Sequence, residues 1–496
     1  MTDDRYGGQV PPPPTSPPVP GSESWQASPT WAPPTEPAYG SAPQAEPAYG
    51  SAPRRRVPRW LIAVAAATMV GSVAAFTIGL LWPVDRGHTP AGPLTFHGFL
   101  PIGQIDYGEP SSTAFTTVQG DRAYVGWEQD GNLRVSAFDL TDAAVRWQTT
   151  VSGAPRWGRL IASPHVLLVL AHEIDSAVAR TLFARDPDTG DERWEIEVRG
   201  DDRLFFTDRV LGWLDRSGGA LRGIDLVTGE QRWSHEFEGA ASVLEVSTQA
   251  ALAQPTDRAG QAHPLGADPR LVLVTADRTV KVIDGHDGSV ISERANVAQP
   301  RDLVLAFEDH LYVVGEQPGY RVESYNLSDL AEPPRTIYSA AELDRSPRAL
   351  EPCGSGRVCV LDTLPFVDEA TAAVAINVDG TVAWQQQVPG GQGLLPVGDW
   401  LAVPTRVNFE SHVVALDHAG EIRHTQPGVP ARLNDGNFIV LDPQLRGATG
   451  YAVAMAQATA LGPLLATTAD QCAWSDRHIV CVGREAAHIW RFAEPG

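Results

Sequence analysis

The sequence predicts an all-β fold, a β-propeller of about eight four-stranded blades, preceded by a disordered tail and one transmembrane helix. Three observations lead to this prediction. A turn pattern that ends in Arg-Trp recurs along the chain, short apolar strands with regular turn signals fill the chain beyond about residue 90, and an uncharged apolar stretch precedes them. The predicted units are a cytoplasmic tail at residues 1–59, a transmembrane helix at 60–82 and an extracytoplasmic propeller at 90–496.

The tail is rich in Pro, Gly, Ser and Ala and has a proline run at 11–14. The octapeptide Glu-Pro-Ala-Tyr-Gly-Ser-Ala-Pro occurs twice in it, at 36–43 and 46–53. Because few aliphatic side chains are available for burial, the entropy cost of ordering should exceed the gain, and we expect disorder. A flexible spacer is favoured over a docking site for a proline-binding domain, since isolated PxxP-type matches are common by chance.

The stretch from Trp60 to Trp82 contains no charged residue, and its apolar part at 61–81 would be about 30 Å long as a helix, enough to cross a bilayer core. The two Trp residues stand where interfacial aromatics belong. Four Arg residues precede the stretch within 54–59, whereas only Arg86 follows closely, so the positive-inside rule predicts a cytoplasmic tail. A cleaved signal peptide is the alternative. The long charged region, the long apolar core and the lack of an A-x-A-like site favour an uncleaved anchor.

The recurring turn is found at 139–147, 186–194 and 225–233, at spacings of about 40 to 50 residues. Each copy has an alternating strand before it, a polar turn at its centre and a Trp-bearing strand after it, which is one hairpin of a propeller blade. Weaker copies occur at 282–292, 323–329, 375–384 and 415–424, and a last one ends at 488–492. In two of them Ser292 and His424 occupy the position of the Trp.

The last unit is predicted to lack its outermost strand, because the chain stops soon after residue 492. A ring of blades is usually completed by one blade that both chain ends share, so we expect the segment 94–100 to supply that strand. About 400 residues at 40 to 50 per blade allow seven to nine blades, of which we predict eight. The stretch 429–465 gives no clean strand assignment.

The pattern Ala-x-Asp-x-x-Thr-Gly-x-x-x-Trp resembles the quinoprotein (PQQ) propeller repeat, most closely at 185–194 and 223–233. The resemblance implies that each Trp packs between adjacent blades, with its indole N–H on a neighbouring backbone carbonyl. A buried indole has a large apolar area and one N–H that needs a partner, so the physical reason is general. The inter-blade structural residues assigned in this way are Trp147, Trp194, Trp233, Trp384 and Trp490.

The resemblance does not extend to a catalytic site. Enzymatic quinoproteins carry an adjacent Cys-Cys disulfide, a catalytic Asp, and Glu and Asn ligands for calcium, whereas no two cysteines are adjacent here and the motif around the catalytic Asp is missing. No HExxH, GxSxG, P-loop or CxxC motif occurs either. We therefore expect no catalytic residue, no cofactor and no metal ligand, with a divergent PQQ-dependent dehydrogenase as the enzymatic alternative.

The four cysteines form two local pairs in the sequence. Cys353 and Cys359 flank a tight turn, and Cys472 and Cys481 flank a longer loop. Cross-strand partners in a hairpin come within disulfide range, and an extracytoplasmic compartment permits oxidation. A metal site is the alternative, but these spacings are not those of zinc sites and no His cluster accompanies them. We predict two disulfides, each between the first two strands of its own blade.

The net charge of −22 makes binding to nucleic acid or to an anionic membrane surface a poor prediction. Lys occurs once, at Lys281, and the bias toward Arg, Ala, Gly and Pro is typical of a GC-rich bacterial genome. Non-catalytic relatives within the PQQ-repeat family that this sequence resembles, such as the propeller lipoprotein of outer-membrane protein assembly, act as interaction platforms. The sequence therefore favours a non-catalytic, single-pass scaffold in the bacterial cell envelope that binds an envelope protein or a cell-wall ligand. A sensor for a cell-wall ligand is the further alternative.

Overall fold

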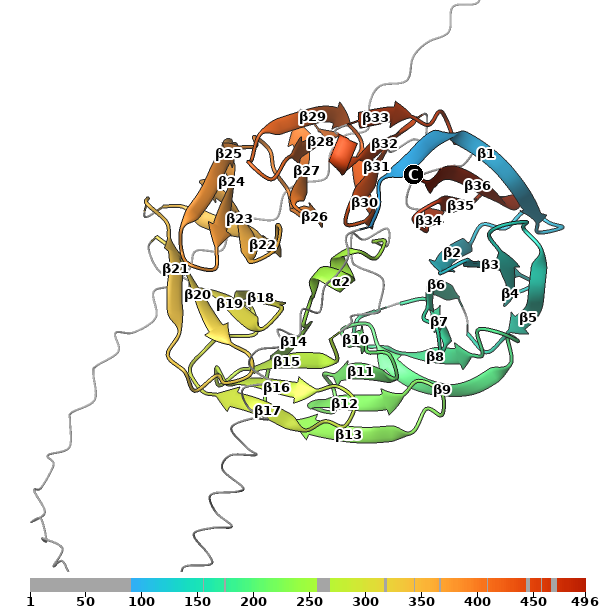
Figure 1. Cartoon of the computed structure of the whole chain (residues 1–496). Coiled ribbons are helices and arrows are strands. Elements are labelled where there is room, and N and C mark those ends of the chain that lie inside the picture. The colour runs from blue at the N-terminus through green and yellow to red at the C-terminus, as the bar shows by residue number, and fades with distance from the viewer. Residues whose placement is uncertain are drawn as a thin grey trace, which may run out of the picture. The chain divides into compact units, whose positions relative to one another are not determined.

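The computed structural model describes residues 91–496, except 155, 174, 257–267, 316–318, 343, 365–366, 408, 443–446, 456, 465–470 and the side chains of 367–369. These residues form nine four-stranded antiparallel sheets that follow one another around a ring (Figure 1). The predicted tail and transmembrane helix lie outside the described residues. Within the described part, no helix is long and apolar enough to span a bilayer.

Eight of the sheets are continuous in sequence and are numbered as blades 1 to 8, each with its first strand innermost and its fourth outermost. Blades 1 to 4 consist of β2 (Ala114–Gln119), β3 (Arg122–Gln129), β4 (Asn132–Asp139) and β5 (Val145–Val151); β6 (Trp157–Ala162), β7 (Leu167–Ala171), β8 (Ala179–Arg185) and β9 (Glu192–Arg199); β10 (Arg203–Phe206), β11 (Val210–Asp215), β12 (Ala220–Asp225) and β13 (Gln231–Glu236); and β14 (Ala241–Glu245), β15 (Arg270–Thr275), β16 (Val280–Asp284) and β17 (Val290–Arg294).

Blades 5 to 8 follow the same plan. They consist of β18 (Leu303–Phe307), β19 (His310–Gly315), β20 (Arg321–Asn326) and β21 (Arg335–Ser339); β22 (Ser346–Pro352), β23 (Arg357–Leu364), β24 (Val367–Asn377) and β25 (Val382–Gln387); β26 (Leu395–Val397), β27 (Trp400–Val407), β28 (Glu410–Leu416) and β29 (Ile422–Pro427); and β30 (Val429–Asn434), β31 (Asn437–Leu441), β32 (Ala448–Ala452) and β33 (Gln457–Ala460). A 3₁₀ turn, η1 (Val453–Met455), follows β32.

Blade 9 closes the ring and is made from both ends of the described chain. It contains β34 (Cys472–Trp474), β35 (His478–Val482) and β36 (Ala486–Pro495), with β1 (Leu94–Asp106) as its outermost strand. β1 pairs antiparallel with β36 in a register that places Leu94 opposite Pro495, and Figure 1 shows the two strands side by side. The predicted closure by the segment 94–100 is therefore confirmed.

The predicted count of eight blades is wrong, because the described residues form nine. The blade that sequence analysis missed is blade 8, whose four strands lie between residues 429 and 460, within the stretch that gave no strand assignment. Its outermost strand reads Gln-Ala-Thr-Ala and carries no Trp, and the preceding residues 453–456 include neither Asp nor Gly, so none of the residues that mark the repeat is present there. The second strand, β31, still has the fully buried apolar character that a middle strand needs.

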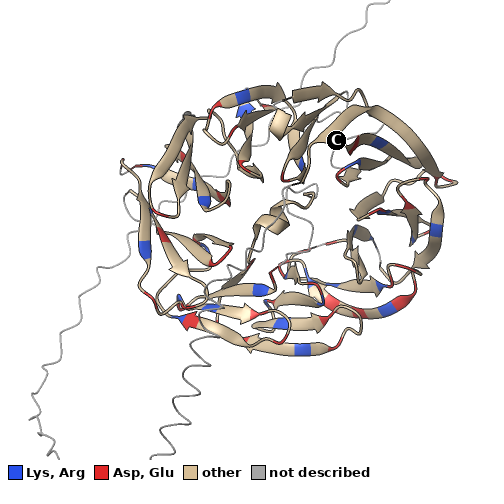
Figure 2. Ribbon diagram, in the orientation of Figure 1, with Lys and Arg blue, Asp and Glu red and all other residues tan. Residues whose placement is uncertain are grey.

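The core lies in the seams between blades. Each cluster of buried apolar side chains draws on two neighbouring sheets; one joins blades 1 and 2, for example, and another joins blades 8 and 9. A second strand is therefore covered on both faces and reads as a continuous apolar run, as in β7, where all five residues are buried. Charged residues of both signs are spread around the ring, many of them in turns (Figure 2).

Candidate functional site: the blade seams and the central strap

The outermost strands of four blades carry a Trp that reaches the next blade. In each case the indole N–H donates a hydrogen bond to a backbone carbonyl in the neighbouring blade's outer turn. The pairs are Trp147 with Pro187 (3.0 Å), Trp194 with Leu226 (3.1 Å), Trp233 with Gly285 (3.0 Å) and Trp384 with His418 (3.1 Å). The rings of the first three are buried, and that of Trp384 is half-buried.

In the three strongest copies of the repeat, the turn before the Trp is held by its Asp. In blade 2, Asp186 accepts hydrogen bonds from the backbone N–H groups of Asp188 and Thr189, and its second oxygen lies 2.7 Å from Nη2 of Arg193. Burial raises the pKa of Asp186, but these hydrogen bonds outweigh it and lower the pKa below its ordinary value. The register shifts beside Trp194, so that Arg193 is the extra residue of a bulge.

The Gly of the same turn makes room for the Trp of the preceding blade. Gly190 has φ +78°, and a Cβ built on it would lie 2.6 Å from Cε3 of Trp147. The same relation recurs at three further seams, where the closest ring or Cβ atom would be 2.5 to 2.6 Å away: Gly229 with Trp194, Gly288 with Trp233, and Gly420 with Trp384. The Gly of one blade's turn and the Trp of the preceding blade therefore form the two sides of one inter-blade contact.

Three positions depart from this arrangement. Ser292 takes the Trp position of blade 4, and its hydroxyl donates to the carbonyl of Leu327 in blade 5 at 2.7 Å. His424 takes it in blade 7, with its ring 4.8 Å from that of Tyr451 in blade 8. Trp490 lies on a third strand, β36, and packs in the apolar cluster between blades 8 and 9.

Both cysteine pairs are disulfide-bonded, as the sequence predicts. Cys353 is bonded to Cys359, with Cα atoms 5.7 Å apart, and Cys472 to Cys481, with Cα atoms 4.0 Å apart. Each bond joins the first and second strands of one blade, at the β22–β23 turn of blade 6 and within β34–β35 of blade 9. All four cysteines are buried, which assigns them to structure rather than to surface chemistry.

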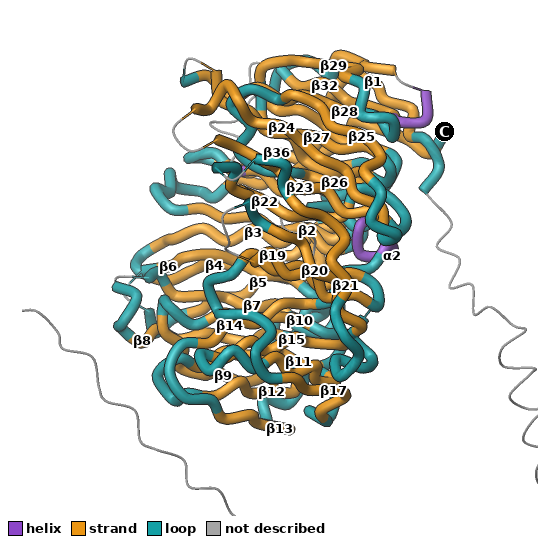
Figure 3. The backbone as a smooth tube through the Cα atoms, turned by 90° about the vertical axis from the view of Figure 1, so that its left-hand side faces the viewer, coloured by secondary structure: helices purple, strands orange, loops and turns teal. Residues whose placement is uncertain are grey.

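The centre of the ring is crossed by an insertion that sequence analysis did not identify. The connection from β14 to β15 in blade 4 is far longer than the corresponding connections of the other blades, and we call its residues 246–256 the central strap. It contains the short helix α2 (Gln249–Leu252), which lies inside the ring in Figure 1 and toward one face of it in Figure 3. In the sequence, this insertion could have been located as a long segment without a strand pattern between the first and second strands of one blade.

The strap first follows blade 5. Ser247 forms a parallel bridge with Phe307 of β18, and its carbonyl accepts a hydrogen bond from the N–H of Glu308 at 2.8 Å. The Glu308 carboxylate in turn accepts from the N–H of Gln249 at 2.8 Å. The strap therefore covers an inner strand edge whose backbone groups would otherwise lack strand partners.

The strap then reaches blade 8. Thr256 donates its backbone N–H to the carbonyl of Arg432 at 3.0 Å, and its hydroxyl accepts the N–H of the same residue at 3.1 Å. The guanidinium of Arg432 donates through Nε to the carbonyl of Gln254 at 3.1 Å and through Nη1 to that of Pro396 in blade 7 at 3.0 Å. The buried Arg432 of blade 8 therefore binds both the strap and blade 7.

Arg432 and Glu351 are two titratable groups near the strap whose pKa values are shifted by burial. Burial lowers the pKa of Arg432 to about 10, which leaves it charged at neutral pH, while Glu351 favours the charge. Burial raises the pKa of Glu351, on β22 of blade 6, to about 7, and the positive charge of Arg432 opposes that rise. Arg432 is therefore charged at neutral pH, and the pKa of the Glu351 carboxyl group lies near neutral pH.

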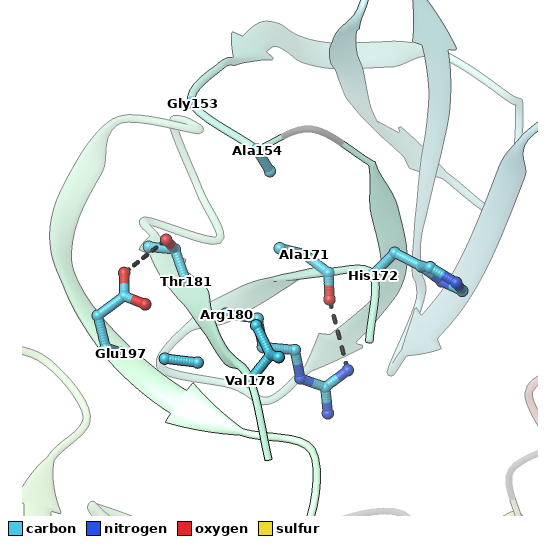
Figure 4. A pocket seen from close by; sticks show the side chains of 9 residues that line it. Gly153, Ala154, Ala171, His172, Val178, Arg180, Thr181 and Glu197 are labelled. Carbon is cyan, nitrogen blue, oxygen red and sulfur yellow. Dashed lines mark hydrogen bonds between the residues drawn. The ribbon is translucent and has the colours of Figure 1, made fainter. Parts of the chain in front are cut away.

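A small pocket lies at the edge of blade 2 (Figure 4). It encloses about 90 Å³ and is lined by Arg180, Thr181, Glu197 and His172, with small residues around them. Thr181 donates its hydroxyl to Glu197 at 2.7 Å, so two of the polar groups already satisfy each other. Drug-sized ligands need roughly 300 Å³ or more, so this pocket admits no cofactor of PQQ size. In the described part of the chain, no three His, Cys, Asp or Glu side chains converge as metal ligands would.

Residues 131–255 match the family model described as outer membrane protein assembly factor BamB. This stretch runs from β4 to the central strap and contains the three strongest copies of the repeat. The match supports PQQ-like repeats within residues 131–255, and the nine sheets show that the described residues form a β-propeller. No curated protein matches the sequence.

Several solved structures are similar in fold. The crystal structure of BamB from Moraxella catarrhalis is 14% identical, covering 79% of this chain and 98% of that chain, with a TM-score of 0.40. A eukaryotic initiation factor is 10% identical over 81% of this chain and 98% of that chain, with a TM-score of 0.50. A europium-containing methanol dehydrogenase is 12% identical over 72% of this chain and 84% of that chain, with a TM-score of 0.37. At these sequence identities the similarity concerns the fold alone, and no activity can be inferred from it.

Proposed function

We propose that this chain is a non-catalytic scaffold of the bacterial cell envelope, anchored by the helix predicted at 60–82, whose propeller binds a protein partner outside the cytoplasm. The observation that carries the proposal is the match of residues 131–255 to a family described as an outer membrane protein assembly factor. The two buried disulfides support an oxidising compartment for the propeller, because structural disulfides are rare in bacterial cytoplasm.

The rigidity of the ring favours a binding role. Seams between blades are packed with apolar side chains, and the strap connects blade 4 to blades 5 and 8 across the centre, so the rim loops are carried by a well-packed ring. One such loop, the β27–β28 hairpin of blade 7, displays Phe409 at 89% exposure and Val407 at 44%. The Arg406 guanidinium lies 5.8 Å from the centre of the Phe409 ring. Aromatic and Arg side chains on a rigid frame are typical of binding hot spots.

Two experiments test this proposal. Cysteine labelling of the full chain in intact cells, with single reporter cysteines in the tail and in an outer turn, should label the outer turn alone from outside. Crosslinking of the intact cells followed by purification should recover a stable partner, and Phe409→Ser should reduce its recovery while Val290→Ser, an exposed apolar change in blade 4, leaves it unchanged. Labelling of the tail from outside, or dye-linked oxidation by the full chain supplied with PQQ and calcium, would contradict the proposal.

A further inference from the structure

The seam between blades 5 and 6 contains a buried carboxylate in otherwise apolar surroundings. Asp362, on β23, is 2% exposed, and Tyr320, which precedes β20, is also 2% exposed and belongs to the apolar cluster of this seam. Tyr338 of β21 lies beside Tyr320, with ring centres 5.8 Å apart. The cluster therefore draws on two blades at one point of contact.

Two polar atoms of this cluster, Oδ1 of Asp362 and the hydroxyl oxygen of Tyr320, are buried without a hydrogen bond of good geometry, and the electrostatic contact between these two side chains is the polar contact they share. The nearest cation is Arg345, in the linker between the blades, whose Nη1 lies 4.0 Å from Oδ1. That guanidinium is already engaged, because Nη1 donates to the carbonyl of Ala370 at 3.1 Å and Nε to Glu342 at 3.0 Å. Asp362 is thus buried with a distant and shared counter-ion.

An ionised carboxylate in this position is costly, because a buried charge without full hydrogen bonding has lost its hydration without replacement. Burial accordingly raises the pKa of Asp362 to about 6, although the charge of Arg345 and the hydroxyl group of Tyr320 both oppose this rise, and Glu342 adds a small further rise. Burial also raises the pKa of Tyr320 and of Tyr338, so both phenols are neutral in this range. Asp362 is therefore a buried group of this seam that changes charge near pH 6, and Glu351 of β22, whose pKa is raised to about 7, is the other carboxyl group of blade 6 that titrates in this range.

We propose that the protonation state of Asp362 controls the seam between blades 5 and 6. The seam is closed when the carboxyl group is protonated and opens more readily when it is ionised. Opening of the seam lets water reach the carboxylate, so the open state binds the proton more weakly than the closed state. Protonation therefore favours the closed seam below pH 4, and this advantage is lost as the pH rises through about 6. Two pKa units correspond to about a hundredfold change in the opening equilibrium.

The test is hydrogen exchange of the full chain, measured by mass spectrometry from pH 5 to 8 and corrected for intrinsic exchange rates. In the natural sequence, opening of peptides from β20, the linker and β23 should increase about tenfold between pH 5 and 8, because the rest of the hundredfold change occurs below pH 5. Peptides of blade 2 should not change. Asp362→Asn should keep the seam closed at every pH. Asp344→Asn, an exposed change in the same linker, should behave as the natural sequence does.

Two results would overturn the proposal. One is a seam whose opening in the natural sequence does not depend on pH, which is measurable even if Asp362→Asn fails to fold. The other is an Asp362→Asn protein that keeps the natural pH dependence, since another group would then be responsible.

Discussion

The contact between a turn Gly and the Trp of the preceding blade predicts a specific cost for adding one methyl group. We expect Gly190→Ala to destabilise the propeller more than the same change at Gly131. Both glycines have similar backbone angles, φ +78° and φ +74°, but a Cβ at Gly190 would lie 2.6 Å from Trp147 while a Cβ at Gly131 meets no atom within 4 Å. The second position therefore isolates the backbone cost and serves as a matched control.

The magnitude follows from two effects. An Ala held at positive φ costs about 1 kcal/mol relative to Gly, and this applies to both variants. Overpacking of a methyl group against a buried ring adds about 1–3 kcal/mol at Gly190 alone. Gly131→Ala should therefore lower the free energy of unfolding by about 1 kcal/mol, and Gly190→Ala by about 2–4 kcal/mol.

The assay is equilibrium urea unfolding followed by far-ultraviolet circular dichroism, with midpoints compared at equal slopes. Trp147→Ala provides the second arm of a double-mutant cycle, because without the indole the Cβ of residue 190 has no ring to meet. In that background Gly190→Ala should cost only the backbone term. Equal costs for the two glycines, or a Gly190→Ala cost that persists without the indole, would refute the inter-blade contact as the reason for the repeated Gly.

Three further predictions concern the strap contact of Arg432, the two disulfides and the hydrogen bond of Ser292. Arg432→Met should loosen the central strap, because the carbonyls of Gln254 and Pro396 lose their donors; amide exchange in the strap should rise at least tenfold, and no rise would contradict its role as the fastening. Cys353→Ser and Cys472→Ser should each lower unfolding stability by about 2–3 kcal/mol, and reductant should abolish the difference from the natural sequence. Ser292→Ala should cost about 1 kcal/mol, measured by urea unfolding, because the Leu327 carbonyl loses its 2.7 Å bond; a neutral result would mean that water replaces the hydroxyl.

The features that sequence analysis located are those that repeat. The Asp, Gly and Arg-Trp positions recur because each forms the same turn and the same seam, and the alternation around them marks the strands. The local disulfides were predictable because a hairpin brings Cys472 directly opposite Cys481. Closure by β1 was predictable because the last unit had three strands and a ring requires four.

What sequence analysis missed occurs once and depends on distant contacts. Arg432 reads as a single charge in an unassigned stretch, and nothing local indicates that it is buried beside a segment from the far side of the ring. The same holds for Asp362, whose burial depends on the meeting of two blades. Such residues are specified by tertiary packing, and no period in the sequence reports them.

The weak repeat of blade 8 has a physical explanation in the segments that this blade holds. Blade 8 has four buried polar residues in and after β30, at positions where apolar side chains could lie: Arg432, Asn434, Asp435 and Asn437. Asn437 accepts the N–H of Leu94 at 2.9 Å and Asp435 accepts that of Ala91 at 2.9 Å, while Arg432 fastens the strap. Buried polar groups are tolerable only when such partners satisfy them, so the beginning of β1, the strap and this turn have to be present together. The blade that departs furthest from the repeat is therefore the one on which the closing strand and the central strap both depend.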